Sequence, residues 1–153
     1  MEELLKAFLF LFFVVFLCAT TVMVFLIVST ILHELWHVIA AKILRGKVSN
    51  ITWFDFQSFL RLFESPEGSV DAGEVYVSLP PDKVRFDWVV DLAGGLGAGL
   101  TFVVAGALIL ALTIKDPFSV FPVIGGVIIS MGIPQFVSGI QECRNKKIYM
   151  GLE

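Results

Sequence analysis

Residues 7–37 read AFLFLFFVVFLCATTVMVFLIVSTILHELWH, and this stretch decides the fold of the chain. From Ala7 to Leu32 it contains no charged residue, no glycine and no proline. An apolar run of about 18 residues or more predicts a helix that crosses a lipid bilayer. The stretch therefore predicts a membrane protein.

The apolar run around this stretch extends from about residue 5 to residue 44, which is long for one span. At a rise of about 1.5 Å per residue, it exceeds the roughly 30 Å of hydrocarbon in a bilayer. Two short spans would need a turn between them, and the run offers no Gly, Pro, Asn or Asp to make one. We therefore favour one long, tilted or protruding helix, with two spans as the alternative.

The composition predicts an integral membrane protein with a single domain, residues 1–153. Hydrophobic residues make up 57% of the chain, charged residues only 16%, and the mean hydropathy is +0.87. The net charge of -3 is small, and no basic stripe with interleaved aromatic residues occurs. Both observations argue against nucleic acid as a partner, because clustered Lys and Arg bind phosphate backbones.

Three apolar segments predict three spans, at about residues 5–44, 88–114 and 118–141, and thus a membrane all-α core. Lys and Arg gather on the cytoplasmic side of membrane proteins, so their distribution predicts the orientation. One side of the three spans has only Lys6 and Lys115, whereas the other side has Lys42, Arg45, Lys47, Arg61, Lys83, Arg85, Arg144, Lys146 and Lys147. We therefore expect a multi-pass protein of the cell membrane whose C-terminus is cytoplasmic.

The polar region between the first two spans, residues 47–87, predicts a small β-hairpin or sheet at the cytoplasmic face. Residues 64–68, ESPEG, are typical of a turn, and residues 74–79, EVYVSL, alternate as a strand does. A strand with a free edge could pair with an extended substrate peptide. An ordinary juxtamembrane loop is the alternative.

The sequence His33-Glu34-Leu35-Trp36-His37 is the strongest functional signal. Spacing i, i+4 on a helix places both imidazoles on one face, where they can bind one Zn²⁺ with Glu34 as the general base. In soluble helices the same pattern often marks only a solvated face, but here it follows a long apolar run. Charged residues near the bilayer centre cost roughly 2.5–3.5 kcal/mol each, so such a cluster indicates a functional site. We expect the metal very roughly 10 Å below the cytoplasmic boundary.

A glycine-rich stretch, Gly94-Gly95-Leu96-Gly97-Ala98-Gly99, lies in the second predicted span. It is not a phosphate-binding loop, because no strand precedes it and no Lys-Ser or Lys-Thr follows it. Glycines four residues apart, such as Gly95 and Gly99, let helix backbones approach closely. We therefore expect this stretch to pack against the HExxH helix.

Together, these features resemble the site-2 protease family of intramembrane zinc metallopeptidases, as a divergent, minimal member. The resemblance rests on the HExxH, on the order of the elements, and on residues 93–98, AGGLGA, which look like the family's A-G-P-L-A-N stretch. Trp36 stands where the family usually has a small residue. The family's third zinc ligand, an Asp in an L-D-G motif after a proline, has no counterpart here, since Pro134 is followed by QFVSGIQE.

A catalytic zinc usually has three protein ligands and a water, so a substitute carboxylate is expected. Glu142 follows Pro134 on the last span and matches the family's Asp in chain order, and we favour it. We expect Pro134 to break the helix locally, so that Glu142 can turn inward. Asp91 in the second span is the alternative ligand, although it could also stabilise the start of its own helix. Gln135 and Ser138 are candidate substrate contacts.

The resemblance implies a zinc metalloendopeptidase that hydrolyses transmembrane protein substrates within the bilayer, near the cytoplasmic side. His33, His37 and Glu142 would bind Zn²⁺, and Glu34 would take the proton of the attacking water. A different membrane zinc peptidase with a glutamate ligand is a weaker alternative, because its E-x-x-A-D motif is missing. The non-enzymatic alternative is a catalytically degenerate membrane homologue that binds transmembrane partners or metal. The oligomeric state stays open.

Overall fold

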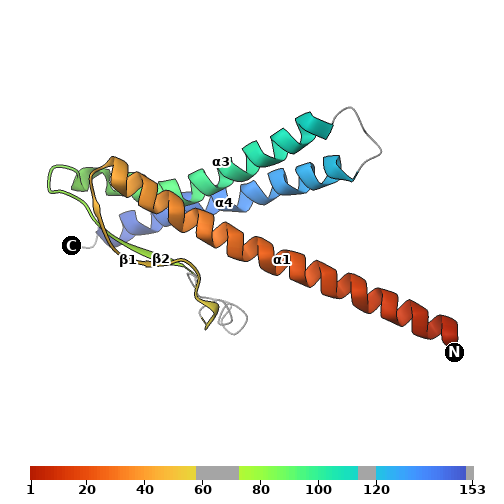
Figure 1. Cartoon of the computed structure of the whole chain (residues 1–153). Coiled ribbons are helices and arrows are strands. Elements are labelled where there is room, and N and C mark those ends of the chain that lie inside the picture. Colours follow the sequence, from red (N-terminus) through yellow and green to blue (C-terminus); the bar gives the residue numbers. More distant parts are fainter. Residues whose placement is uncertain (58–72, 114–119, 151–153) are drawn as a thin grey trace.

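The computed structural model of the protein describes residues 1–57, 73–113 and 120–150. Figure 1 shows two helices side by side as an antiparallel pair, with a longer helix crossing them and extending far beyond them toward the N-terminus. A small sheet lies beside the C-terminal end of the long helix. The helical elements are α1 (Glu2–Ile43), the short 3-10 helix η1 (Val84–Phe86), α3 (Asp87–Thr113) and α4 (Phe121–Met150).

The first apolar run forms one continuous helix, as the absence of turn residues predicted. α1 has 42 residues, which corresponds to about 63 Å at 1.5 Å per residue. After it, Arg45 adopts a left-handed backbone conformation with φ 61°. The N–H groups of Arg45 and Gly46 donate to the carbonyls of Lys42 and Ala41, so the last carbonyls of the helix are satisfied in a Schellman arrangement.

Glycines let α3 approach both of its neighbours, on two different faces. A Cβ on Gly95 would collide with the backbone of Gly139 in α4, and one on Gly99 would come within 3.0 Å of α4. The glycine-rich stretch packs against the HExxH helix as expected, but Gly95 and Gly99 do not make that contact. Gly94 and Gly97, which lie on the adjacent face of α3, make the contacts with α1 instead.

α4 runs through Pro134 without a break, so the expected local interruption of the helix is wrong. A proline removes one backbone hydrogen bond, but prolines are tolerated in helices whose neighbours hold them in place. Gly132 and Gly139, on either side of Pro134, both contact the backbone of α3. Glu142 lies about two turns beyond Pro134, so the regular helix itself directs this side chain inward.

β1 (Lys47–Thr52) and β2 (Glu74–Ser78) form an antiparallel two-stranded sheet, as predicted for this region. Val75 and Val77 of β2 are half-buried and alternate with exposed residues. The sheet contacts the C-terminal part of α1, which explains why one of its faces is apolar. The turn expected at residues 64–68 lies outside the described residues.

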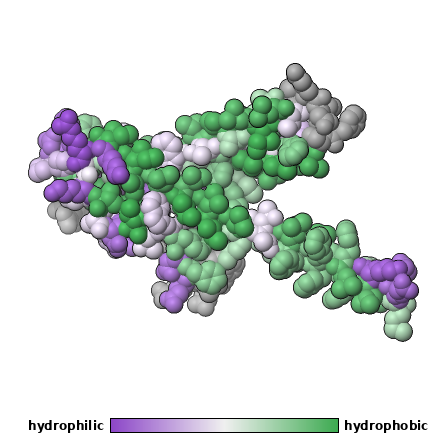
Figure 2. All heavy atoms as spheres, viewed as in Figure 1, coloured by the Kyte–Doolittle hydropathy of each residue, from purple (hydrophilic) through white to green (hydrophobic). Residues whose placement is uncertain are grey.

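Apolar side chains cover most of the helical surface, whereas hydrophilic residues gather at two ends of the molecule (Figure 2). One hydrophilic end is the N-terminal tip of α1, and the other is formed by the sheet and the adjoining helix ends. Among the described residues, three helices are long and apolar enough to cross a membrane: Glu2–Ile43, Val84–Thr113 and Phe121–Cys143. These helices correspond to the three apolar segments of the sequence.

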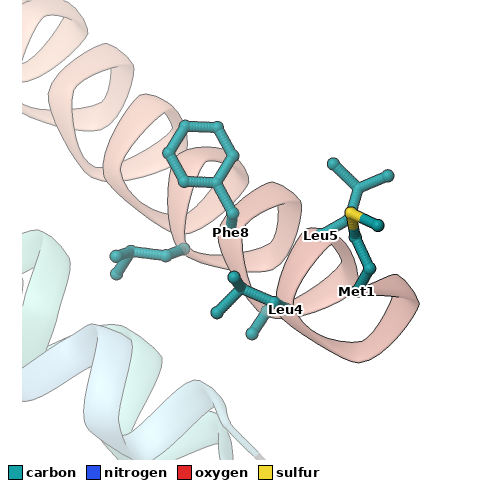
Figure 3. A pocket seen from close by; sticks show the side chains of 6 residues that line it. Met1, Leu4, Leu5 and Phe8 are labelled. Carbon is teal, nitrogen blue, oxygen red and sulfur yellow. The ribbon is translucent and has the colours of Figure 1, made fainter.

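The N-terminal half of α1 stands apart from the other helices, and residues 1–22 are exposed. A shallow hollow in this part is shown in Figure 3. Its lining residues all belong to this one stretch of chain and are Met1, Leu4, Leu5, Ala7, Phe8 and Leu11. Because a single helix supplies apolar side chains only, the hollow has no group that could carry chemistry. The candidate site residues His33, Glu34 and His37 lie in the opposite half of α1.

Candidate metal centre

Three side chains of metal-binding type converge between α1 and α4. His33 and His37 lie one turn apart on α1, and Glu142 reaches them from α4. His33 Nε2 lies 3.2 Å from both carboxylate oxygens of Glu142, and His37 Nε2 lies 3.8 Å from Glu142 Oε2. Ligand atoms about 2.0–2.1 Å from a tetrahedral zinc are themselves about 3.3 Å apart. With one atom from each residue within 4.8 Å of the others, this group could hold a metal ion.

Of the two carboxylates considered as the third ligand, Glu142 belongs to this group and Asp91 does not. Asp91 is half-buried in the first part of α3. α3 meets the histidines with the backbone of Gly94, whereas α4 meets them with a carboxylate. Glu142, which the sequence favoured because of its place after Pro134, is therefore the carboxylate that lies beside the histidines.

His37 is oriented by a backbone carbonyl on α3. Its Nδ1 lies 2.6 Å from the oxygen of Val90, so an Nδ1–H donates there and Nε2 is left to face Glu142. Metal-binding histidines usually donate their second ring N–H in this way, which fixes the tautomer and the ring orientation. This contact could not be predicted from the sequence, because every residue has a backbone carbonyl.

Ser138 orients the candidate carboxylate ligand from one turn earlier on α4. Its hydroxyl donates to Glu142 Oε1 at 2.8 Å. Gln135, one turn before Ser138, lies beside His33. Both residues were expected at suitable depth for substrate contact. In the structure they lie next to the candidate metal ligands instead. Residues 135, 138 and 142 share one face of α4, and this spacing could have indicated that Gln135 and Ser138 lie beside the ligands.

Two glycines of α3 set the position of α1 at this site. A Cβ on Gly94 would collide with the imidazole of His37 and would lie 2.6 Å from His33 Nε2. The indole ring of Trp36 lies directly on Gly97, and Trp36 Nε1 donates to Thr101 Oγ1 at 3.1 Å. The bulky Trp36, which departs from the family pattern, is thus matched by a residue without a side chain on the facing helix.

Glu34 is nearly enclosed, whereas the metal-binding group is partly open. Glu34 is 6% exposed, and the side chains of His33 and His37 are 12% and 14% exposed. The Glu142 side chain is 34% exposed, so the group is reached most easily along α4. A carboxylate that acts as a general base must lie within about 2.6–3.2 Å of the proton that it takes, or one water away from it.

The residue types indicate which chemistry the group can support. Two imidazoles and a carboxylate bind Zn²⁺ and other divalent ions, and three protein ligands leave a position for a water. Comparisons of the chain with protein-family models, with curated proteins and with solved structures gave no match. His33, His37 and Glu142 are therefore identified as a candidate metal centre by their geometry alone.

Proposed function

We propose that this protein is a zinc metalloendopeptidase that cuts transmembrane protein substrates within the bilayer. The convergence of His33, His37 and Glu142, directly beside Glu34, is the observation that supports this most. Two histidines and one glutamate are an established ligand set of catalytic zinc. Their position in helices that are apolar enough to cross a membrane favours a membrane-embedded peptidase of the site-2 protease type over a soluble one.

Each residue of the centre has a defined part in the proposed reaction. A bound Zn²⁺ would lower the pKa of a water to about 7 and polarise the scissile carbonyl. Glu34 takes the proton from the attacking water and passes it to the leaving amine. The Val90 carbonyl holds His37, and Ser138 holds Glu142, so the ligands are oriented by the protein itself.

The position of the centre along the helices suggests where substrates are cut. His37 lies six residues before the end of α1 at Ile43, or about 9 Å along the helix axis. Nine of the eleven Lys and Arg residues lie on this side of the predicted spans, which favours a cytoplasmic location. Substrates would therefore be cut close to the cytoplasmic ends of their membrane-spanning segments.

The sheet beside α1 offers a way to present a substrate. A peptide must be extended before its carbonyl can be attacked, and a strand edge can hold it in that form through backbone hydrogen bonds. β1 and β2 pair with each other through one edge each, and each strand has a second, outer edge. We infer that one outer edge receives the unwound part of the substrate.

Zinc content and cleavage of a membrane-spanning substrate, measured in detergent, test this proposal. The variants are Glu34→Gln, Glu142→Ala and Asp91→Ala beside the wild type. Glu34→Gln should keep its zinc and lose cleavage, because only the proton acceptor is removed. Glu142→Ala should lose both zinc and cleavage, whereas Asp91→Ala should keep its zinc. A chelator should abolish wild-type cleavage, and added Zn²⁺ should restore it.

The possible outcomes separate the alternatives. A wild-type protein without zinc, or cleavage that survives Glu34→Gln, would exclude the peptidase and favour a degenerate homologue that binds transmembrane partners. Loss of zinc in Asp91→Ala but not in Glu142→Ala would show that the third ligand is wrongly assigned. A cleavage site outside the membrane-spanning segment would favour the other class of membrane zinc peptidase.

A further inference from the structure

Gly73, the residue before β2, is buried against the side chain of Glu34. A Cβ on Gly73 would lie 2.7 Å from Glu34 Cγ and 2.8 Å from Glu34 Oε1. It would also lie 2.8 Å from Thr30 Cγ2. Non-bonded carbon atoms are normally about 3.5–4.0 Å apart, so only a glycine lets the backbone come this close.

Glu34 occupies the face of α1 that turns toward the sheet. Thr30, Glu34, Val38 and Ala41 follow one another at intervals of four, four and three residues, so they line one side of the helix. Val38 and Ala41 are buried like Glu34, with 7% and 0% exposure. The metal-binding histidines lie on the neighbouring side of the helix. The Glu34 side chain therefore lies against the backbone of Gly73, on the side of α1 next to the histidines.

We propose that Gly73 is a positioning residue for the general base, with its backbone holding the Glu34 carboxylate on the side of the metal centre. This role presupposes the peptidase function proposed for the same site. A general base must lie within about 2.6–3.2 Å of the group whose proton it takes. A misplacement of about 1 Å can cost roughly 100-fold in rate, so a rigid neighbour on the opposite side of Glu34 has a large effect.

A methyl group at position 73 would displace Glu34 rather than its other neighbours. The carboxylate is the far end of a flexible side chain. Thr30 is β-branched and its hydroxyl is bound to the Leu26 carbonyl at 3.0 Å. The backbone of Gly73 leads directly into β2, which begins at Glu74 and pairs with β1. Gly73→Ala should therefore leave the fold and the metal ligands in place and move the base.

The test compares zinc-loaded wild type with Gly73→Ala and with Gly126→Ala, whose added Cβ would meet nothing within 4 Å. Zinc content, kcat and KM for a transmembrane substrate, and the Kd of a hydroxamate inhibitor are measured. A hydroxamate binds zinc and can donate a hydrogen bond to the base, so its affinity reports the base without turnover. Gly73→Ala should keep its zinc and KM, lower kcat by about 10- to 100-fold and weaken the hydroxamate by about tenfold. Gly126→Ala should behave as wild type.

Two double variants identify the side chain that the added methyl meets. Thr30→Ser removes the Cγ2 that also faces Gly73, so it should not restore kcat in Gly73→Ala if the effect acts through Glu34. If Gly73→Ala fails to fold, Glu34→Asp should restore folding and zinc binding, because the shorter side chain makes room for the methyl. Failure of that rescue would overturn the proposed contact.

Three results would overturn the positioning role while leaving the peptidase function intact. They are a kcat of Gly73→Ala within about twofold of wild type, loss of zinc together with kcat, and recovery of kcat through Thr30→Ser. A wild type that neither cleaves nor binds the hydroxamate in a zinc-dependent way would instead exclude the peptidase function, and the role of Gly73 with it.

Discussion

Ser138 is not a ligand, yet it should matter for metal binding because its hydroxyl holds Glu142 Oε1 at 2.8 Å. Loss of a residue that orients a ligand typically weakens metal affinity by about 10- to 100-fold. We expect this loss of zinc affinity in Ser138→Ala, measured by competition with a chelating dye. Ser130→Ala is the control, since the Ser130 hydroxyl is bound to the Val127 carbonyl of the same helix. Equal affinities of Ser138→Ala and wild type would show that Glu142 needs no support.

Gly94 should be needed for the histidines to keep their positions. A methyl group there would overlap His37 Nε2 and lie 2.6 Å from His33 Nε2. These are the two ring nitrogens that face Glu142. Gly94→Ala should therefore lose most of its zinc while circular dichroism still reports the wild-type helix content. Gly94→Ala with wild-type zinc content would mean that α1 and α3 can separate without disturbing the centre.

At the level of residues, the sequence predicted the parts of the site that have a motif and missed those that depend on the packing of helices. His33, Glu34 and His37 follow from their spacing, and Glu142 follows from its place after Pro134. The Val90 carbonyl could not be predicted, because its role appears only once α3 lies against α1. Gly73 was missed for the same reason, whereas Ser138 was named as a candidate substrate contact and instead donates to Glu142.

The α3–α4 pair should respond to glycine substitution in a graded way. A Cβ on Gly95 would overlap the backbone of Gly139, which cannot move aside as a side chain can. A Cβ on Gly99 would lie 3.0 Å from the Gly132 carbonyl oxygen and from the Phe136 ring. This contact is less close than that of Gly95, and the Phe136 side chain can move aside. We expect Gly95→Ala to lower the free energy of unfolding by about 1–3 kcal/mol and Gly99→Ala by less. Thermal unfolding in detergent measures both, and the reverse order would contradict this packing.

The positions of the helices along the chain were predicted well, whereas the faces through which the helices pack on each other were predicted less well. The apolar segments 5–44 and 88–114 match α1 and α3 to within a few residues. α4 continues to Met150, beyond the predicted end of the span at 141, because a helix is not limited to its apolar part. The glycines at 94, 95, 97 and 99 cover two adjacent faces of α3, and a sequence does not tell which face meets which neighbour.

For the whole molecule, the predicted orientation would place the N-terminus and the sheet on opposite sides of the membrane, because α1 alone separates them along the chain. Glu3 is exposed near the N-terminus and Ser78 is exposed on β2, so both can be replaced by cysteine for labelling. With Cys18 and Cys143 replaced by serine, a membrane-impermeant maleimide should label Glu3→Cys on intact cells. It should label Ser78→Cys only after permeabilisation. The side of the spans that contains the sheet is rich in Lys and Arg, which predicts that it faces the cytoplasm. Labelling of both positions on intact cells would exclude a single crossing of the membrane between them.

Of the three candidate ligands, His33 and Glu142 lie 109 residues apart along the chain. At a synthesis rate of about 5–20 residues per second, roughly 5–20 s pass between the histidines and Glu142. A growing chain that has not reached Glu142 already contains Glu34 and both histidines. It has only two of the three candidate ligands. The proposed chemistry begins only when α4 has been inserted beside α3. Under the proposed function, the order in which the ligands are made would protect neighbouring membrane proteins from an incomplete peptidase.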